Sequence, residues 1–149
     1  MEVQEYFRDF LALLNAHEVK FMIVGVGYAL AFHGAPRFTG DIDVFVKSDH
    51  ENIKRIIKAL ADFGFSSLDL TIDDFLDQNK VVQLGVPPVR IDIITSISGV
   101  TWEEADASKE PGPFGDVSVS FIGKKQFIAN KRASGRKKDL ADIEALGEE

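Results

Sequence analysis

Residues 20–46 read KFMIVGVGYALAFHGAPRFTGDIDVFV, and their hydrophobic pattern decides the expected fold. The run from Lys20 to Val24 is almost wholly apolar, which is typical of a buried strand. The Gly-Val-Gly that follows interrupts the strand, and residues 28–32 have the character of a short helix. Residues 41–46 alternate acidic with apolar side chains before continuing apolar, which predicts a second strand with two carboxylates on one face.

The remainder of the chain extends this beginning into a larger α/β pattern. Apolar spacing and capping residues predict further helices over residues 2–17, 49–63, 71–78, 102–107, 124–134 and 136–146. Strand patterns occur at residues 80–84, 89–94 and 116–122, the last alternating as an exposed strand does. We therefore expect one α/β (α+β) domain over residues 1–149, with a mixed sheet of four or five strands, helices on its faces and a basic C-terminal helix pair.

Composition narrows the classes of protein and site. The chain has 149 residues, 45% of them hydrophobic and 28% charged, which is enough for one domain with a hydrophobic core. Cysteine is absent, which excludes disulfides, thiolate metal sites and cysteine nucleophiles, and the three histidines are too few for a histidine-rich zinc site. No apolar run approaches the roughly 18 residues that span a bilayer, and the N-terminus is not signal-like, so we expect no membrane association and a cytoplasmic location.

Charge is distributed unevenly along the chain. The net charge is −7, yet residues 124–138 contain seven of the 17 basic residues and no acidic ones. The rest of the chain is strongly acidic and would be repelled by nucleic acid at long range. The basic segment is therefore either the place where a phosphate-bearing partner is met or a solvated helix surface, and composition leaves both open.

Three aspartates lie on predicted strands in a pattern that folding alone does not explain. Asp41 and Asp43 are two residues apart, so both side chains project from one face of their strand, and two adjacent anions are unfavourable without a cation between them. Asp92 lies between isoleucines in the predicted strand 89–94. If the two strands are neighbours, three carboxylates converge on one edge of the sheet and would bind Mg²⁺ or Mn²⁺. The alternative is that Asp41 is a turn or cap residue and the other two face water.

The glycines before this strand add a second indication. Gly25 and Gly27 end a buried strand and open a helix, which leaves backbone N–H groups free to receive a phosphate. Most Gly-x-Gly sequences are plain tight turns, and neither the P-loop nor the dinucleotide-binding pattern is complete here. The Asp-x-Asp strand begins 14 residues after Gly27, and this proximity favours a phosphate site.

Residues 23–43, IVGVGYALAFHGAPRFTGDID, resemble the pattern VGG-x-A…HG…PR-x-T-x-D-[IL]-D of nucleotidyltransferases with the DNA polymerase β type of fold. The resemblance is to small bacterial and archaeal members, including the minimal nucleotidyltransferases and the type IV toxin (AbiEii-like) branch. Residues 131–146 are similar to the C-terminal motif K…R-x-KD-L-x-D-I of that group. The matched pieces cover about 20–46, 89–94 and 124–146.

The resemblance implies the nucleotidyltransferase fold and a role for each matched residue. Asp41 and Asp43 would bind two catalytic Mg²⁺ (or Mn²⁺) ions, and Asp92 would complete the acid set and activate the acceptor hydroxyl. The residues implied in nucleotide or phosphate binding are Gly25, Val26, Gly27, Arg37, Thr39, Lys131 and Lys138. Val26 departs from the family pattern, which has its first glycine there. His33 and Thr39 are interpreted mainly as residues that shape the loop.

The implied activity is transfer of a nucleoside monophosphate from a nucleoside triphosphate to a hydroxyl acceptor (RNA, protein or small molecule), with release of pyrophosphate. The resemblance also implies a toxin–antitoxin setting and with it a protein partner. The alternative is a catalytically weak or inactive module of the same fold that binds a nucleotide or a protein, which the irregular glycine turn favours. A two-metal phosphohydrolase is disfavoured because no histidine lies beside the acids in sequence.

The basic segment yields one further prediction. On residues 124–134, Phe127, Ile128 and Ala133 would anchor the helix to the core and leave Lys131 free to point elsewhere. We expect Lys131 and Lys138 to face the metal site and bind donor phosphates. Lys124, Lys125 and Lys137 are expected to be solvated.

Overall fold

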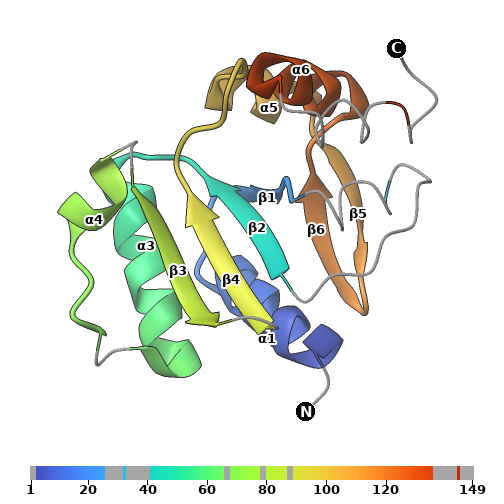
Figure 1. Ribbon diagram of the computed structural model, residues 1–149. Helices are drawn as coiled ribbons and strands as arrows, with labels where there is room; N and C mark the ends of the chain where they lie inside the picture. The colour runs from blue at the N-terminus through green and yellow to red at the C-terminus, as the bar shows by residue number, and fades with distance from the viewer. Residues whose placement is uncertain are drawn as a thin grey trace.

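The computed structural model describes residues 3–25, 32, 41–65, 68–77, 80–86, 89–135 and 144. Within these residues, six strands form one mixed sheet in the order β3-β4-β2-β1-β6-β5 (Figure 1). The strands are β1 (Phe21–Ile23), β2 (Asp41–Val46), β3 (Val81–Val86), β4 (Val89–Ile94), β5 (Glu110–Phe114) and β6 (Val117–Phe121). The predicted α/β class with a mixed sheet is therefore confirmed.

Helices connect and cover these strands. They are α1 (Val3–Ala16), α3 (His50–Leu60), the π-helical turn η1 (Ala61–Phe65), α4 (Ile72–Leu76), α5 (Trp102–Ser108) and α6 (Lys124–Ser134). The α-helix predicted over 49–63 ends at Leu60 instead. The π-helical turn continues to Phe65, and the φ of 103° at Gly64 inside it is incompatible with a regular helix. The helices predicted over 28–32 and 136–146 lie outside the described residues, apart from Phe32 and Glu144. None of the described helices is long and apolar enough to cross a bilayer.

Strand pairing shows why the sheet is mixed. β2 runs parallel to β4 and antiparallel to β1, while β1 runs parallel to β6. Two antiparallel hairpins, β3–β4 and β5–β6, form the two ends of the sheet. β2 and β4 are therefore internal strands, and the residues on them have neighbours on both sides.

Two predictions about the strands are wrong. The sheet has six strands rather than four or five, because β5 (EPGPF) was not expected to form one. Its two prolines lack N–H groups, and they are tolerated because β5 is an edge strand with a single neighbour. β6 is internal rather than exposed, with Val117, Val119 and Phe121 buried, so its alternation marks a strand with one buried face.

One face of the sheet is covered by α1 and α3. Ile42 and Val44 of β2 and Ile91 of β4 point to this side and are fully buried against helix residues such as Phe10 and Ile53. The alternation of these apolar residues with charged ones fixes the register of both strands, because a shift by one residue would bury the charges.

A buried asparagine fastens α3 to the sheet. Asn52 is 1% exposed, and its side chain bonds to the backbone on each side of the β1–β2 pair. Its Oδ1 accepts from Lys20 N at 2.7 Å, and its Nδ2 donates to Lys20 O at 3.0 Å and to Lys47 O at 2.8 Å. Asp49 caps the same helix by accepting a hydrogen bond from the Asn52 N–H at 2.7 Å, which lowers the pKa of Asp49.

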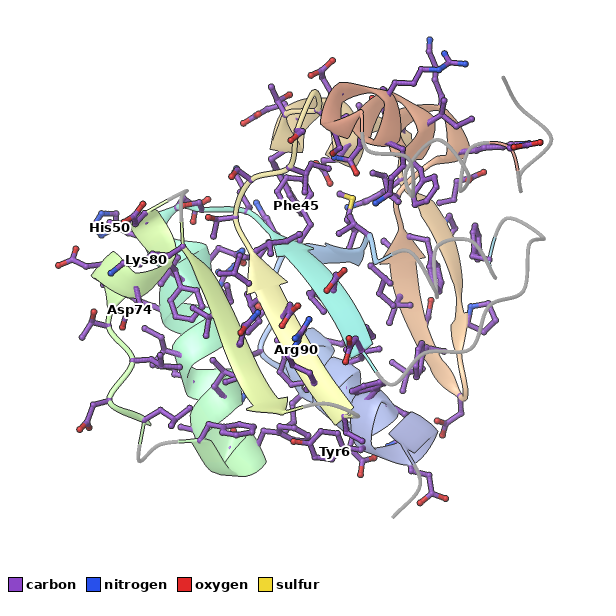
Figure 2. The ribbon with its side chains drawn as sticks, viewed as in Figure 1. Tyr6, Phe45, His50, Asp74, Lys80 and Arg90 are labelled. Atoms are coloured by element: carbon purple, nitrogen blue, oxygen red, sulfur yellow. The ribbon has the colours of Figure 1, made fainter. Side chains whose placement is uncertain are left out.

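The opposite face is covered at one end by α5 and α6, which lie together at the top of Figure 1. Met22 and Phe45 pack there against Trp102 and Phe127, and the Phe45 and Trp102 rings meet edge to face with centroids 5.2 Å apart. In Figure 2, Phe45 marks the end of β2 nearest these helices. Among the described residues, no helix covers the other end of β2 on this face, where its aspartates lie.

Candidate functional site

Four charged residues form a block on the face of the sheet opposite α1 and α3. The parallel register of β2 and β4 places Asp41 opposite Arg90 and Asp43 opposite Asp92. Residues two apart on a strand share a face, so all four side chains lie on one surface. The structure therefore brings the three predicted aspartates together, but on the face of two internal strands rather than at an edge of the sheet. Figure 2 shows Arg90 on the side of β4 that faces the viewer.

Asp43 is the most perturbed acid of this block. Burial, followed by the charge of Asp92 and a hydrogen bond between the two side chains, raises the pKa of Asp43 to about 6. The charge of Asp41 acts in the same direction, whereas the charge of Lys131 opposes it. When two carboxyl groups lie this close, ionising both is unfavourable unless they share a proton or a cation lies beside them.

Arg90 supplies part of the positive charge. Its Nε lies 2.9 Å from Asp92 Oδ1, and its Nη2 lies 3.6 Å from Asp41 Oδ2. The first contact is an ion pair without an aligned hydrogen bond, because both Arg90 Nε and Asp92 Oδ1 are buried and neither has a hydrogen-bond partner. Sequence reasoning missed Arg90, although its position two residues before Asp92 on the same strand was a usable signal.

Lys131 reaches the block from α6. Phe127 and Ile128 anchor this helix in the core, whereas Ala133 is exposed, so the predicted third anchor is wrong. Lys131 is itself 7% exposed, and its Nζ lies 5.4 Å from the centre of the Phe127 ring. A buried lysine beside an ionisable aspartate is positioned by the protein rather than left in solvent.

Two other lysines of α6 lie elsewhere. Lys124 and Lys125 line an open hollow of about 510 Å³ together with Ile128, Ala129 and Arg132. The helix thus presents one cation to the acid block and three to this hollow.

Gly25 packs directly against Asp43. A Cβ at position 25 would lie 3.0 Å from Asp43 Cβ and 3.1 Å from Asp43 Oδ2. The neighbouring Val24 N–H donates to Asp43 O at 3.1 Å and continues the β1–β2 pairing. Glycine at this position therefore allows the chain to pass close to the Asp43 carboxylate. The other predicted phosphate-binding residues lie outside the described residues: Val26, Gly27, Arg37, Thr39 and Lys138.

The three aspartates suit a hard divalent cation in their chemistry. All their donor atoms are carboxylate oxygens, which Mg²⁺ and Mn²⁺ prefer, and Asp92 Oδ1 is buried without a hydrogen bond. In the described parts of the chain, no three His, Cys, Asp or Glu side chains are already arranged around one point. Arg90 contacts two of the three acids, so binding an ion requires these side chains to rearrange.

A scan against protein-family models gives no match for this chain, and a search of curated proteins gives none either.

Proposed function

We propose that this chain is a metal-dependent nucleotidyltransferase. It would transfer a nucleoside monophosphate from a nucleoside triphosphate to a hydroxyl acceptor. The acceptor oxygen forms a bond to the α-phosphorus, the bond from that phosphorus to the β-phosphate bridging oxygen breaks, and pyrophosphate leaves. The acceptor's proton is lost to a base.

The in-register pairing of Asp43 with Asp92 supports this proposal most strongly. Two acids placed opposite each other on parallel internal strands, with Asp41 on the same face, form a concentration of negative charge that contributes nothing to the core. Such arrangements destabilise the folded chain unless a cation offsets them, and they are characteristic of functional sites. The sequence resemblance to nucleotidyltransferases points to the same three residues.

The three aspartates of the block, Lys131 and Gly25 each have a role in this chemistry. Asp41 and Asp43 would hold the divalent cations, with Asp92 completing the set. Divalent cations held there would neutralise negative charge that develops during transfer. Asp92 orients the acceptor hydroxyl and accepts its proton. Lys131 binds donor phosphate oxygens through its ammonium group, and Gly25, which has no side chain, lets the triphosphate approach the backbone beside Asp43.

The test is incubation of the protein with Mg²⁺ and cell extract in the presence of each nucleoside triphosphate, labelled at either the α- or the γ-phosphate. We expect α-label, and no γ-label, to become attached to an acceptor. Asp43→Asn should lose the transfer, whereas Asp73→Asn, an exposed acid of α4, should retain it. Attachment of γ-label would indicate phosphoryl transfer instead, and transfer by Asp43→Asn at the wild-type rate would contradict the proposal.

A second candidate is a binding module of the same fold without turnover. The contact of Arg90 with Asp41 and Asp92 favours it, because a permanent ion pair would keep a divalent cation out. In that case the protein would bind a nucleotide or a protein partner, and no α-label would be transferred with any of the nucleotides.

A further inference from the structure

Arg90 contacts its aspartates differently from a structural arginine elsewhere in the molecule. Arg8 binds Asp116 with two aligned hydrogen bonds, from Nε to Oδ1 at 2.6 Å and from Nη2 to Oδ2 at 2.9 Å. This paired geometry is the strong arrangement for an arginine and a carboxylate. The Arg8–Asp116 pair joins α1 to the β5–β6 turn, and both of its hydrogen bonds are formed within the protein.

Arg90 has no such paired geometry. Its approach to Asp92 is close, at 2.9 Å, but the donor and acceptor atoms are not aligned for a hydrogen bond. Its distance of 3.6 Å to Asp41 is beyond hydrogen-bond range. The guanidinium therefore interacts with both acids through charge, while the hydrogen-bonding capacity of Asp92 Oδ1 stays unused.

The Arg90 side chain can also move into solvent. It is 27% exposed, whereas the Asp92 side chain is 10% exposed. An arginine can move its charged end into water while its apolar stem stays against the sheet, but the aspartate is fixed on an internal strand. Of the two partners, Arg90 is the one able to leave the contact without a change in backbone.

We propose that Arg90 is a displaceable counterion that occupies the acid block in the absence of metal and competes with a divalent cation for Asp41 and Asp92. This inference rests on the metal-dependent function proposed above. In the metal-free protein, the positive charge of Arg90 stabilises the acids. When a metal ion binds, Arg90 leaves its contact with them in exchange.

A competing Arg90 and an Arg90 that helps to bind the metal predict opposite changes in metal affinity when Arg90 is removed. If Arg90 competes with the ion, its removal raises metal affinity, but if it orients Asp92 for the ion, its removal lowers affinity. Calorimetric titration of Mn²⁺ into wild type and Arg90→Gln distinguishes the two. We expect Arg90→Gln to bind Mn²⁺ about tenfold more tightly, which corresponds to about 1.4 kcal/mol. An unchanged or lower affinity would overturn the proposal.

Two further variants serve as controls. Arg55→Gln removes an arginine of similar exposure that pairs with Glu51 on α3, and it should leave Mn²⁺ affinity unchanged. Arg90→Lys keeps the charge, so its affinity should stay within about threefold of wild type. An Arg90→Lys affinity as high as that of Arg90→Gln would contradict the proposal, because charge would then not be what competes.

Thermal melting gives an independent readout. In EDTA, Arg90→Gln should melt below wild type, because Asp41 and Asp92 lose a counterion. In saturating Mn²⁺ the two proteins should melt together, and an equal deficit in both conditions would overturn the exchange. If Mn²⁺ binds wild type and is lost in Asp43→Asn, while Arg90→Gln binds like wild type, only the exchange fails. If Mn²⁺ binds none of the proteins saturably, the proposed metal site fails together with it.

Discussion

Asn52 and Asp92 are both almost completely buried, and they belong to opposite sides of the same sheet. Asn52 makes three side-chain hydrogen bonds to the backbone of Lys20 and Lys47, which flank β1 and β2, in addition to its own backbone bond to the helix cap. Asp92 faces Asp43 across the parallel pair, and its Oδ1 has no hydrogen-bond partner.

This difference separates Asn52, a structural polar residue, from Asp92, which we propose to be functional. A buried polar group that stabilises a fold has its hydrogen bonds satisfied within the protein. A buried carboxylate beside other carboxylates costs stability, and we propose that Asp92 lies there because it binds a ligand.

Removing the Asn52 side chain should cause the largest loss of stability. Asn52→Ala removes the partner of the Lys20 N–H and of the Lys47 carbonyl beside the core, whereas Lys20 O keeps the hydrogen bond from the Lys47 N–H. We expect the free energy of unfolding to fall by about 3 kcal/mol. Urea denaturation measures this loss. The control is Asn15→Ala, which removes one exposed hydrogen bond to Ser118 O and should cost less than about 1 kcal/mol. Equal losses of stability in the two variants would show that Asn52 contributes no more to the fold than Asn15 does.

Removing the charge of Lys131 on α6 tests the proposed role of this residue in nucleotide binding. Lys131→Met keeps the apolar stem over Phe127 but removes the ammonium beside Asp43. We expect binding of a non-hydrolysable nucleoside triphosphate with Mg²⁺ to weaken by about 2 kcal/mol, the scale of a charge-assisted contact. Lys124→Met, on the hollow away from the acids, should change binding little. Equal, small effects in calorimetry would show that α6 contributes only surface charge.

Neutralising an acid of the block should stabilise the metal-free protein. Asp43→Asn removes repulsion with Asp92 and Asp41, so we expect the free energy of unfolding in EDTA at pH 8 to rise by about 1–2 kcal/mol. The folded protein raises the pKa of Asp43 from 3.8 to about 6. Folding therefore favours the protonated form, and wild-type stability is lost as pH rises through this interval.

The same substitution makes a prediction about pH. Asparagine has no proton to lose, so the stability difference between Asp43→Asn and wild type should grow from near zero at about pH 4 to its full value above about pH 6. Urea denaturation at several pH values measures this profile. A variant less stable than wild type at pH 8 would indicate that Asp43 is a structural residue.

The smallest expected effect on stability concerns the glycine beside the acids. Gly25→Ala places a methyl group about 3.0 Å from both the Cβ and the backbone N of Asp43, so the backbone and side chain of Asp43 have to shift by a few tenths of an ångström. We expect a loss of stability of about 1 kcal/mol. Mn²⁺ affinity measured by calorimetry should fall severalfold. Unchanged affinity would show that the position of Asp43 does not depend on this packing.

The sequence alone was sufficient for most of the fold that positions the site. Residues 41–46 and 89–94 alternate so strongly that both strands were predicted within their observed bounds. β5 was missed because the local cues of two prolines and a glycine contradict a strand, and only pairing with β6 along the sheet edge makes one. Tertiary context also decided that β6 is internal.

For the site, sequence spacing identified the aspartates but not their surroundings. That Asp41 and Asp43 share a face follows from the period of two, whereas the pairing of Asp43 with Asp92 depends on which strands are neighbours. That Arg90 shares a face with Asp92 follows from their spacing of two residues, whereas its contact with Asp41 depends on the register between the two strands. The burial of Lys131 depends on how α6 packs through Phe127 and Ile128.

Anomalous diffraction from crystals grown with Mn²⁺ tests the metal site most directly. Our account predicts an anomalous peak within coordination distance of carboxylate oxygens from Asp41, Asp43 and Asp92, with the Arg90 guanidinium withdrawn from Asp92. A map without an anomalous peak at these three carboxylates, with Arg90 still in contact with Asp92, would contradict it.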